Sequence, residues 1–365
     1  MNISLTWKSR KTADKDENAN PALTSDLTRH KHVMTLDYMS SKERQSRNTE
    51  QSKKIPKSDT TSPRQYKPGM AGHVNVLFCC DDDSDDLPTL RVECGRQIGG
   101  RGSGQGQLQD ATDLKFARDG SLFVTDLVNS RVQKFDENGD VVSVFQSEDI
   151  LEPWASAVTP DGHVAITSRK NSKVIVLDIE GNVTGSFGEN HLSCPSGIAV
   201  TGEGNFIVTD FQTSKVFVFS ADGSYVRQMI VSAGSTFNQP RYVTVSPHGD
   251  VIVSDSGNHR LVVFDKNFNF VRAIGSFGKR DGFFKFPHAT CTDDLGNILV
   301  CDRYNDRVSA FTRKGEFVRH LVTSVHKLHH PQGLALSPNT ALYVSHGGLK
   351  AHTVTVVKLN VSVSE

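Results

Sequence analysis

The sequence predicts an all-β protein: a six-bladed β-propeller preceded by a disordered N-terminal tail. Three observations carry this prediction. A repeat of about 44 residues occurs six times, each copy holds short runs of strand-forming residues separated by turn residues, and the first 88 residues are poor in glycine and aromatic side chains. Four strands in a repeat of this length are typical of a propeller blade.

Residues 1–88 form the predicted tail. They hold two of the 29 glycines and four of the 28 aromatic residues, and the first seventy carry 14 Lys and Arg against 8 Asp and Glu. A segment with so little apolar surface to bury cannot offset the loss of chain entropy on folding. We therefore expect a disordered polar tail over 1–88 and a propeller over 89–365.

Each repeat is marked by a proline and by a polar residue fifteen positions later. The pairs are Pro153/Ser168, Pro195/Asp210, Pro240/Asp255, Pro287/Asp302 and Pro331/His346, with Ala111/Asp126 as a first copy that lacks the proline. Successive polar markers are 42, 42, 45, 47 and 44 residues apart. This constant internal gap indicates six copies of one structural unit.

Turn residues recur in register with these markers. The glycines six residues before the marker are Gly120, Gly162, Gly204, Gly249 and Gly296, and those thirteen after it are Gly139, Gly181, Gly223 and Gly315, with Phe268 in place of glycine in the fourth copy. Alternating β-formers such as Phe206-Ile207-Val208 lie between them. Because glycine supplies the positive φ of tight hairpins, each copy predicts strand, turn, strand, loop, strand, turn, strand.

The two ends of the repeat region are predicted to meet. The sixth copy ends after Val354–Val357 without a fourth strand, while residues 89–98 precede the first copy and resemble the outer strands of other copies. We expect residues 89–98 to supply the closing outer strand of the last blade, which would remove an open sheet edge.

Two stretches resemble NHL repeats: the blade Gly249–Asp265, which contains Asn258-His259-Arg260-Leu261, and the run Gly102–Leu108. The resemblance covers residues 90–365 and is closest to the C-terminal NHL propeller of TRIM-NHL proteins. It implies a propeller that binds protein or RNA partners. In those relatives a RING, B-boxes and a coiled coil precede the propeller, and the RING supplies ubiquitin transfer. Residues 1–88 lack the eight or so Cys and His ligands of a RING and any heptad run, so a ubiquitin-ligase role follows from the resemblance only.

Four Asp-to-basic pairs five residues apart recur among the blades: Asp126/Arg131, Asp210/Lys215, Asp255/Arg260 and Asp302/Arg307. Catalysis requires one asymmetric site, so a feature that several blades repeat is interpreted as structural. We expect ion pairs that bridge two strands in each of these blades.

The residues that break the repeat on one rim are the candidates for binding. Positions just after the proline and just after the marker should project around the channel mouth, where an exposed mixture of aromatic and basic residues suits a peptide anchor or base stacking. The predicted binding rim is Trp154, Arg169, Phe211, Arg241, Tyr242, His288, Arg303 and Tyr304. The alternative is that Trp154 and Phe211 merely pack between blades.

The predicted function is a non-catalytic interaction module that binds a protein or peptide partner. Residues 89–365 carry 27 Lys and Arg against 28 Asp and Glu, which places single-stranded RNA second, bound through a local patch of Arg169, Arg241 and Arg303. A third alternative is a propeller hydrolase or lyase, but such sites hold a metal among several channel side chains, and only His288 directly follows a blade proline. No cofactor and no metal are therefore predicted.

The cellular location predicted from the sequence is the cytoplasm. The N-terminus has no apolar signal segment, no stretch reaches the length of a membrane-spanning helix, and the six cysteines show no disulfide framework. We therefore expect reduced thiols and no membrane contact.

Overall fold

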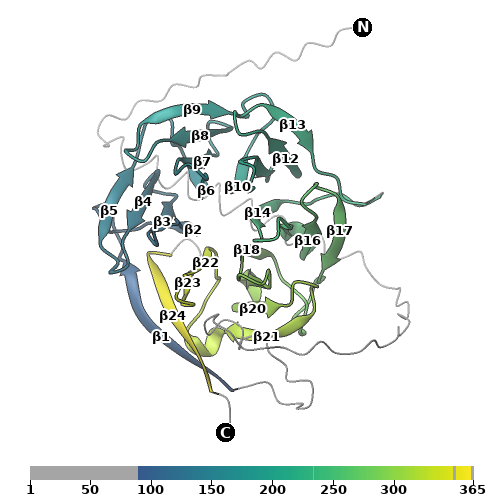
Figure 1. The fold of residues 1–365 in the computed structure, drawn as a ribbon. Coiled ribbons are helices and arrows are strands. Elements are labelled where there is room, and N and C mark those ends of the chain that lie inside the picture. Colours follow the sequence, from purple (N-terminus) through teal and green to yellow (C-terminus); the bar gives the residue numbers. More distant parts are fainter. Residues whose placement is uncertain (1–88, 233, 348–350, 363–365) are drawn as a thin grey trace, which may run out of the picture. The chain divides into compact units, whose positions relative to one another are not determined.

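The computed structural model describes residues 89–232, 234–347 and 351–362. The predicted tail over 1–88 lies outside the described residues. Within the described part the chain forms six four-stranded antiparallel sheets arranged around a central axis, which confirms the predicted all-β, six-bladed propeller (Figure 1).

The blades follow one another along the chain, and the strands of each are given from the inside outward. Blade 1 consists of β2 (Ala111–Phe116), β3 (Leu122–Asp126), β4 (Arg131–Phe135) and β5 (Val141–Phe145). Blade 2 consists of β6 (Pro153–Val158), β7 (Val164–Ser168), β8 (Lys173–Leu177) and β9 (Val183–Phe187). Blade 3 consists of β10 (Pro195–Val200), β11 (Phe206–Asp210), β12 (Lys215–Phe219) and β13 (Tyr225–Gln228).

Blade 4 consists of β14 (Pro240–Val245), β15 (Val251–Asp255), β16 (Arg260–Phe264) and β17 (Phe270–Ile274). Blade 5 consists of β18 (Pro287–Thr292), β19 (Ile298–Asp302), β20 (Arg307–Phe311) and β21 (Phe317–Val322). Blade 6 consists of β22 (Leu334–Leu336), β23 (Leu342–Ser345), β24 (Thr353–Ser362) and β1 (Thr89–Gly99). Three short 3₁₀ turns, η2 (Ser256–Asn258), η3 (Arg303–Asn305) and η4 (Ser324–His326), lie in loops.

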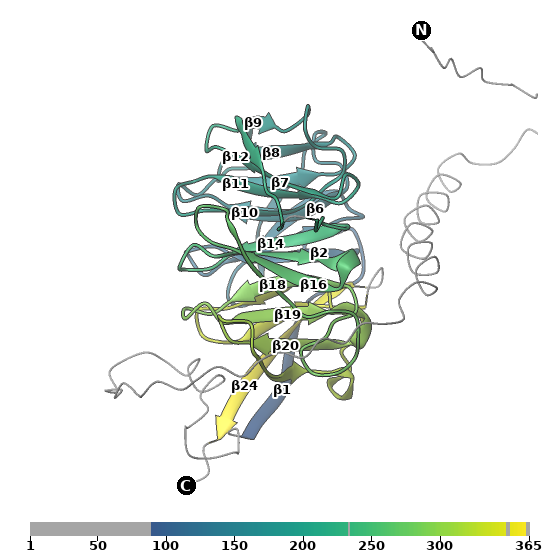
Figure 2. The ribbon, with the colours of Figure 1, turned by 90° about the vertical axis from the view of Figure 1, so that its right-hand side faces the viewer.

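The sixth blade joins the two ends of the described chain. β1 pairs antiparallel with β24, from Thr89 opposite Ser362 to Gly99 opposite Thr353. Figure 1 shows the blue β1 beside the yellow β24, and Figure 2 shows the two strands running together as a ribbon. This pairing hydrogen-bonds an N-terminal strand to the last strand of the ring, so that the first and sixth blades become neighbours.

The repeat markers coincide with strand ends. In blades 2–5 the proline opens the inner strand and pairs with the marker at the end of the second strand, as in Pro195 opposite Asp210 and Pro240 opposite Asp255, whereas Pro331 and His346 lie just outside the strands of blade 6. Proline is tolerated at the first residue of a strand, where its missing N–H breaks no ladder bond. The two markers therefore meet at one face of the propeller, which we call the mouth face.

Apolar side chains from adjacent blades fill the spaces between sheets. The last residue of the third strand is a fully buried phenylalanine in four blades, namely Phe135, Phe219, Phe264 and Phe311. Since each of these rings is removed from water between two sheets, it contributes roughly 2 kcal/mol of burial free energy. This packing holds the inner strands rigidly around the channel.

Candidate functional site at the channel mouth

The site begins with a recurrent bulge in the inner strands. In blades 1–5 regular pairing breaks directly after the first residue; in blade 2, Pro153 pairs with Ser168, but the next pair is Ser156 with Ile166. A bulge re-aims the side chain that it carries. The residues at the bulge are Thr112, Trp154, Ser196, Arg241 and His288.

Backbone hydrogen bonds hold the neighbouring loops at the same face. The amide of Arg169 donates to the carbonyl of Glu152, that of Phe211 to Cys194, and that of Tyr304 to Lys285, at 3.3, 3.0 and 3.1 Å. Each bond ties the loop after a second strand to the segment that enters the first strand of the same blade. The predicted rim residues that follow the prolines and those that follow the markers are thus brought to one face.

Four of the predicted residues form a cluster in which each of two guanidinium groups contacts both of two aromatic rings. The Arg169 Cζ lies 4.6 Å from the Trp154 ring centre and 5.7 Å from that of Phe211. The Arg241 Cζ lies 5.3 Å from Trp154 and 4.5 Å from Phe211. Cation–π contacts at these distances are attractive, so each guanidinium is held in place by two rings.

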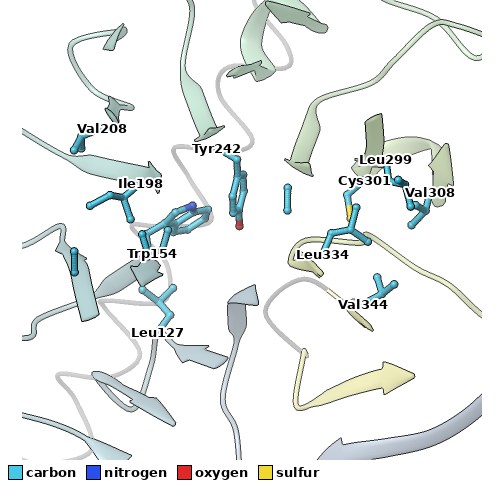
Figure 3. Packing of buried hydrophobic residues seen from close by; sticks show 14 of the residues in the cluster. Leu127, Trp154, Ile198, Val208, Tyr242, Leu299, Cys301, Val308, Leu334 and Val344 are labelled. Carbon is cyan, nitrogen blue, oxygen red and sulfur yellow. The ribbon is translucent and has the colours of Figure 1, made fainter. Parts of the chain in front are cut away.

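Tyr242 spans the channel next to this cluster. Its ring centre lies 6.1 Å from that of Trp154, and its hydroxyl donates a 2.5 Å hydrogen bond to the carbonyl of Thr112, from blade 4 to blade 1. Figure 3 shows Trp154 and Tyr242 next to each other between the inner strands. Burial, and secondarily the charge of Asp113, raise the pKa of Tyr242 well above its usual value, so the hydroxyl keeps its proton.

A polar chain continues the site on the far side of Tyr242. The His288 ring centre lies 5.6 Å from that of Tyr242, and the Arg303 Nη1 lies 3.4 Å from His288 Nδ1. Arg303 also donates to the Gln332 side chain. Burial, together with the charges of Arg303 and Arg241, lowers the pKa of His288 well below its usual value, so the imidazole is neutral at physiological pH.

Burial corrects one part of the sequence-based expectation. The predicted rim residues do converge on the channel mouth, but the side chains expected to be exposed are largely enclosed. Five of the eight predicted rim residues have a relative exposure of only 2–9% and are called the buried group. Tyr304 is 38% exposed, and Arg169 and Phe211 are half-buried. The buried group is Trp154, Arg241, Tyr242, His288 and Arg303. Trp154, Arg241 and His288 stand at the inner-strand bulge, Tyr242 follows it, and Arg303 lies in η3; their side chains form the chain of contacts described above.

A row of aromatic rings leads away from the mouth; of its members only Tyr304 was among the predicted rim residues. The ring centres of Tyr304 and Phe286 are 5.5 Å apart. Those of Phe286 and His259 are 4.8 Å apart, and those of His259 and Phe277 are 4.9 Å apart. His330 packs on the other side of Tyr304 at 5.4 Å. We call these five residues the aromatic row.

The aromatic row is partly open to solvent: Phe277 is 61% and Tyr304 38% exposed. His259, Phe286 and His330 adopt positive φ of 57°, 53° and 46°. An αL conformation at bulky residues is not expected from sequence, so the positions of these three side chains were not predictable. The available signal was an aromatic or histidine residue directly before the proline in two blades, Phe286 and His330.

The repeated Asp-to-basic pairs are structural in three of the four blades. The Arg131, Arg260 and Arg307 Nε atoms lie 3.1, 2.8 and 2.8 Å from the carboxylates of Asp126, Asp255 and Asp302. In blade 3 the expectation of an ion pair is wrong. There Asp210 accepts hydrogen bonds from the amides of Ser193 and Cys194 and from Thr213, while Lys215 is exposed.

The described residues contain no group of three or more His, Cys, Asp or Glu side chains placed to hold a metal ion. The only helices in the described part are the 3₁₀ turns, and none could cross a membrane. Cys94, Cys194, Cys291 and Cys301 are free thiols.

Comparison with known proteins identifies the repeats. The NHL repeat family matches residues 192–219, 237–264 and 284–311, which lie in blades 3, 4 and 5. Protein brain tumor of Drosophila melanogaster is 32% identical over 102 residues, which are 27% of this chain and 10% of that protein. The human NHL repeat-containing protein 3 is 29% identical over 80 residues, 21% of this chain and 23% of that protein. These matches thus span less than a quarter of either relative.

Solved structures agree on the fold. The virginiamycin B lyase from Staphylococcus aureus superposes with a TM-score of 0.55 at 10% sequence identity, covering 76% of this chain and 90% of that one. Identity this low shows a shared fold alone. Blade count, repeat phase and family match agree: the chain is a six-bladed β-propeller that carries NHL repeats and resembles the C-terminal propeller of TRIM-NHL proteins.

Proposed function

We propose that this chain is a non-catalytic interaction module that binds a protein partner through the mouth face. The observation that carries the proposal is the surface formed by half-buried Arg169 and Phe211 and exposed Tyr304 and Phe277 over a rigid, interlocked base. Aromatic and arginine side chains are enriched among binding hot spots, and rigid side chains lose little entropy when a partner orders them.

RNA is the second candidate. The observation that favours it is the cluster of Arg169, Trp154, Arg241 and Phe211. Bases stack on aromatic rings and on guanidinium planes alike. The balanced charge of residues 89–365 argues against RNA, since phosphate binding draws on a net basic surface. A hydrolase or lyase has no comparable support, because the likeness to a lyase structure extends to the fold only. A ubiquitin-ligase role rests on the TRIM-NHL resemblance alone.

The proposal is tested by quantitative pull-down with the full-length chain. A variant with Arg169→Gln, Phe211→Ala and Tyr304→Ala should lose captured proteins by at least about tenfold, because hot-spot truncations cost roughly 2 kcal/mol or more each. The matched control is a variant of the opposite face, Arg118→Gln with Leu295→Ala; the Leu295 side chain is 50% exposed.

Equal capture by the mouth-face variant and the wild type would overturn the proposal, provided both melt alike. Captured RNA that is lost steeply with added salt would instead favour the second candidate. We also propose a cytoplasmic location, which the free thiols of the four described cysteines support.

A further inference from the structure

Arg169 stands out among the arginines of the mouth face because its guanidinium is fixed yet incompletely used. It stacks against the ring of Trp154, and its only side-chain hydrogen bond to described residues runs from Nε to the Cys194 Sγ at 3.1 Å. Nη1 and Nη2 have no partner among the described residues. A planar guanidinium with two parallel N–H groups to offer matches a carboxylate in bidentate geometry.

The surroundings of Arg169 are positive. Arg241 shares the same two aromatic neighbours, and Arg303 lies beyond Tyr242 and His288. Neither Arg169 nor Arg303 takes part in an ion pair between described residues, whereas Arg131, Arg260 and Arg307 each pair with an aspartate. The nearby carboxyl of Asp113 pairs with Lys115 at 3.9 Å, and burial raises its pKa. Arg169 and Arg303 are therefore the guanidinium groups of this face that favour an anionic ligand.

A continuous path connects this cationic site to the aromatic row. Trp154 contacts Tyr242 at 6.1 Å between ring centres, and Tyr242 contacts His288 at 5.6 Å. His288 contacts Arg303, whose Cζ lies 5.7 Å from the Tyr304 ring centre. From Tyr304 the aromatic row runs on to Phe277, where the Lys285 Nζ lies 5.6 Å from the ring centre. The mouth face thus offers a cationic end and an apolar, partly exposed end.

We infer that the mouth face binds an acidic peptide: a segment whose carboxylate pairs with Arg169 beside Arg241 and whose aromatic or aliphatic side chains, further along the segment, lie on the aromatic row. This inference rests on the proposed function and names the chemistry of the partner. A carboxylate fits because charge-assisted bidentate bonds need one planar anion, and the aromatic row adds apolar area elsewhere on the same face. Neutral His288 and the protonated Tyr242 add no anion to the site.

The test is fluorescence anisotropy on the full-length chain with four labelled probes. The first is a peptide of two glutamates and two phenylalanines separated by a glycine–serine spacer, made in both orders. The second has lysines for the glutamates, the third has alanines for the phenylalanines, and the fourth is a short oligouridylate. The first probe should bind at least about tenfold more tightly than the second, and the third should fall between them.

Substitutions locate the binding on the chain. Arg169→Gln should weaken the first probe about tenfold or more, because it removes the charge-assisted hydrogen bonds to the carboxylate, and Arg169→Lys should recover only part of the loss. Phe277→Ala should weaken the first probe severalfold and leave the third unchanged. Arg118→Gln on the opposite face is the matched control and should change nothing. Phe277 is 61% exposed, so its replacement leaves the fold intact.

Equal binding of the glutamate and lysine probes, or no effect of Arg169→Gln in a variant that melts normally, would overturn the inference. Preferential binding of the oligouridylate, weakened by Arg169→Gln and by salt, would overturn it in favour of a phosphate ligand. Failure of this inference can be distinguished from failure of the proposed function. If protein capture depends on the mouth face but no acidic peptide binds, the inference fails while the proposed function stands.

Discussion

Trp154 lies where the hydrophobic core meets the channel mouth. It is 5% exposed, contacts Tyr242, and is flanked by the guanidinium groups of Arg169 and Arg241. Its position after a blade proline indicated the mouth face, but the sequence left open whether the side chain is exposed or packs between blades, because its direction depends on a bulge that no single residue type announces. The same limit applies to Arg241, His288 and Arg303.

Replacing Trp154 by alanine is expected to lower the free energy of unfolding by roughly 3 kcal/mol, because a large buried ring leaves a cavity among rigid inner strands. Tyr304→Ala, at an exposed ring of the same face, should change it by no more than about 0.5 kcal/mol. Urea unfolding of the full-length chain measures both. Equal, small effects would show that Trp154 is a surface residue.

The arginine of the buried ion pair in blade 5 should matter far more than the lysine at the same position of blade 3. Arg307 contacts Asp302 and donates to the carbonyls of Lys279 and Phe283 at 2.9 and 2.8 Å, whereas Lys215 is exposed. Arg307→Ala is expected to cost about 3 kcal/mol, since it leaves a buried carboxylate unpaired, and Lys215→Ala close to nothing. Comparable losses in denaturant titrations of the two variants would contradict this assignment.

At the scale of the element, the turns were the most predictable feature. Glycine marks the first and second hairpins of most blades, and these glycines have φ between 81° and 94°. The same backbone conformation persists where the glycine is missing: Phe268 and Thr340 have φ of 64° and 66°. The blade therefore requires a positive φ at this turn position, and the residue there adopts it whether or not it is glycine. The aromatic row could not be predicted, since its members come from different loops and meet only through the ring of blades.

Thr340→Gly is expected to raise the free energy of unfolding by about 1 kcal/mol, because a β-branched residue at positive φ is strained and glycine is not. The matched change at the same turn of blade 5, Gly296→Ala, should be destabilising. There φ is 81°, and an added Cβ would lie 3.0 Å from the His248 side chain. Thermal melts of both variants check the pair, and a lower melting temperature for Thr340→Gly would refute the strain argument.

At the scale of the whole molecule, periodicity carried the prediction of six blades, because a constant gap between markers reports the architecture even where single strands are weak. The site was predictable in location only. Proline and marker positions indicated the mouth face, but burial at the mouth arises from side chains of different blades meeting in the channel, as in the Tyr242 hydrogen bond to Thr112. A repeat pattern cannot report contacts between its copies.

Deleting residues 89–99 should abolish cooperative unfolding, because β24 would lose its antiparallel partner and the buried Ile98 would be removed from the core beside Val354 and Val356. A chain beginning at residue 89 should melt like the full-length chain, as the composition of 1–88 predicts. Thermal melts followed by circular dichroism compare the full-length chain, the chain that begins at residue 89 and the variant that lacks residues 89–99. An unchanged melt after deletion of 89–99 would show that β1 is dispensable.

The central claim is that the mouth face binds the partner, and site-specific photo-crosslinking tests it most directly. A photoreactive phenylalanine analogue is placed in the full-length chain either at Tyr304 on the mouth face or at Leu295 on the opposite face, where the side chains are 38% and 50% exposed. We expect protein adducts from position 304 that are suppressed by the glutamate–phenylalanine peptide, and few from position 295. Adducts that form at position 295 and not at 304 would contradict the claim.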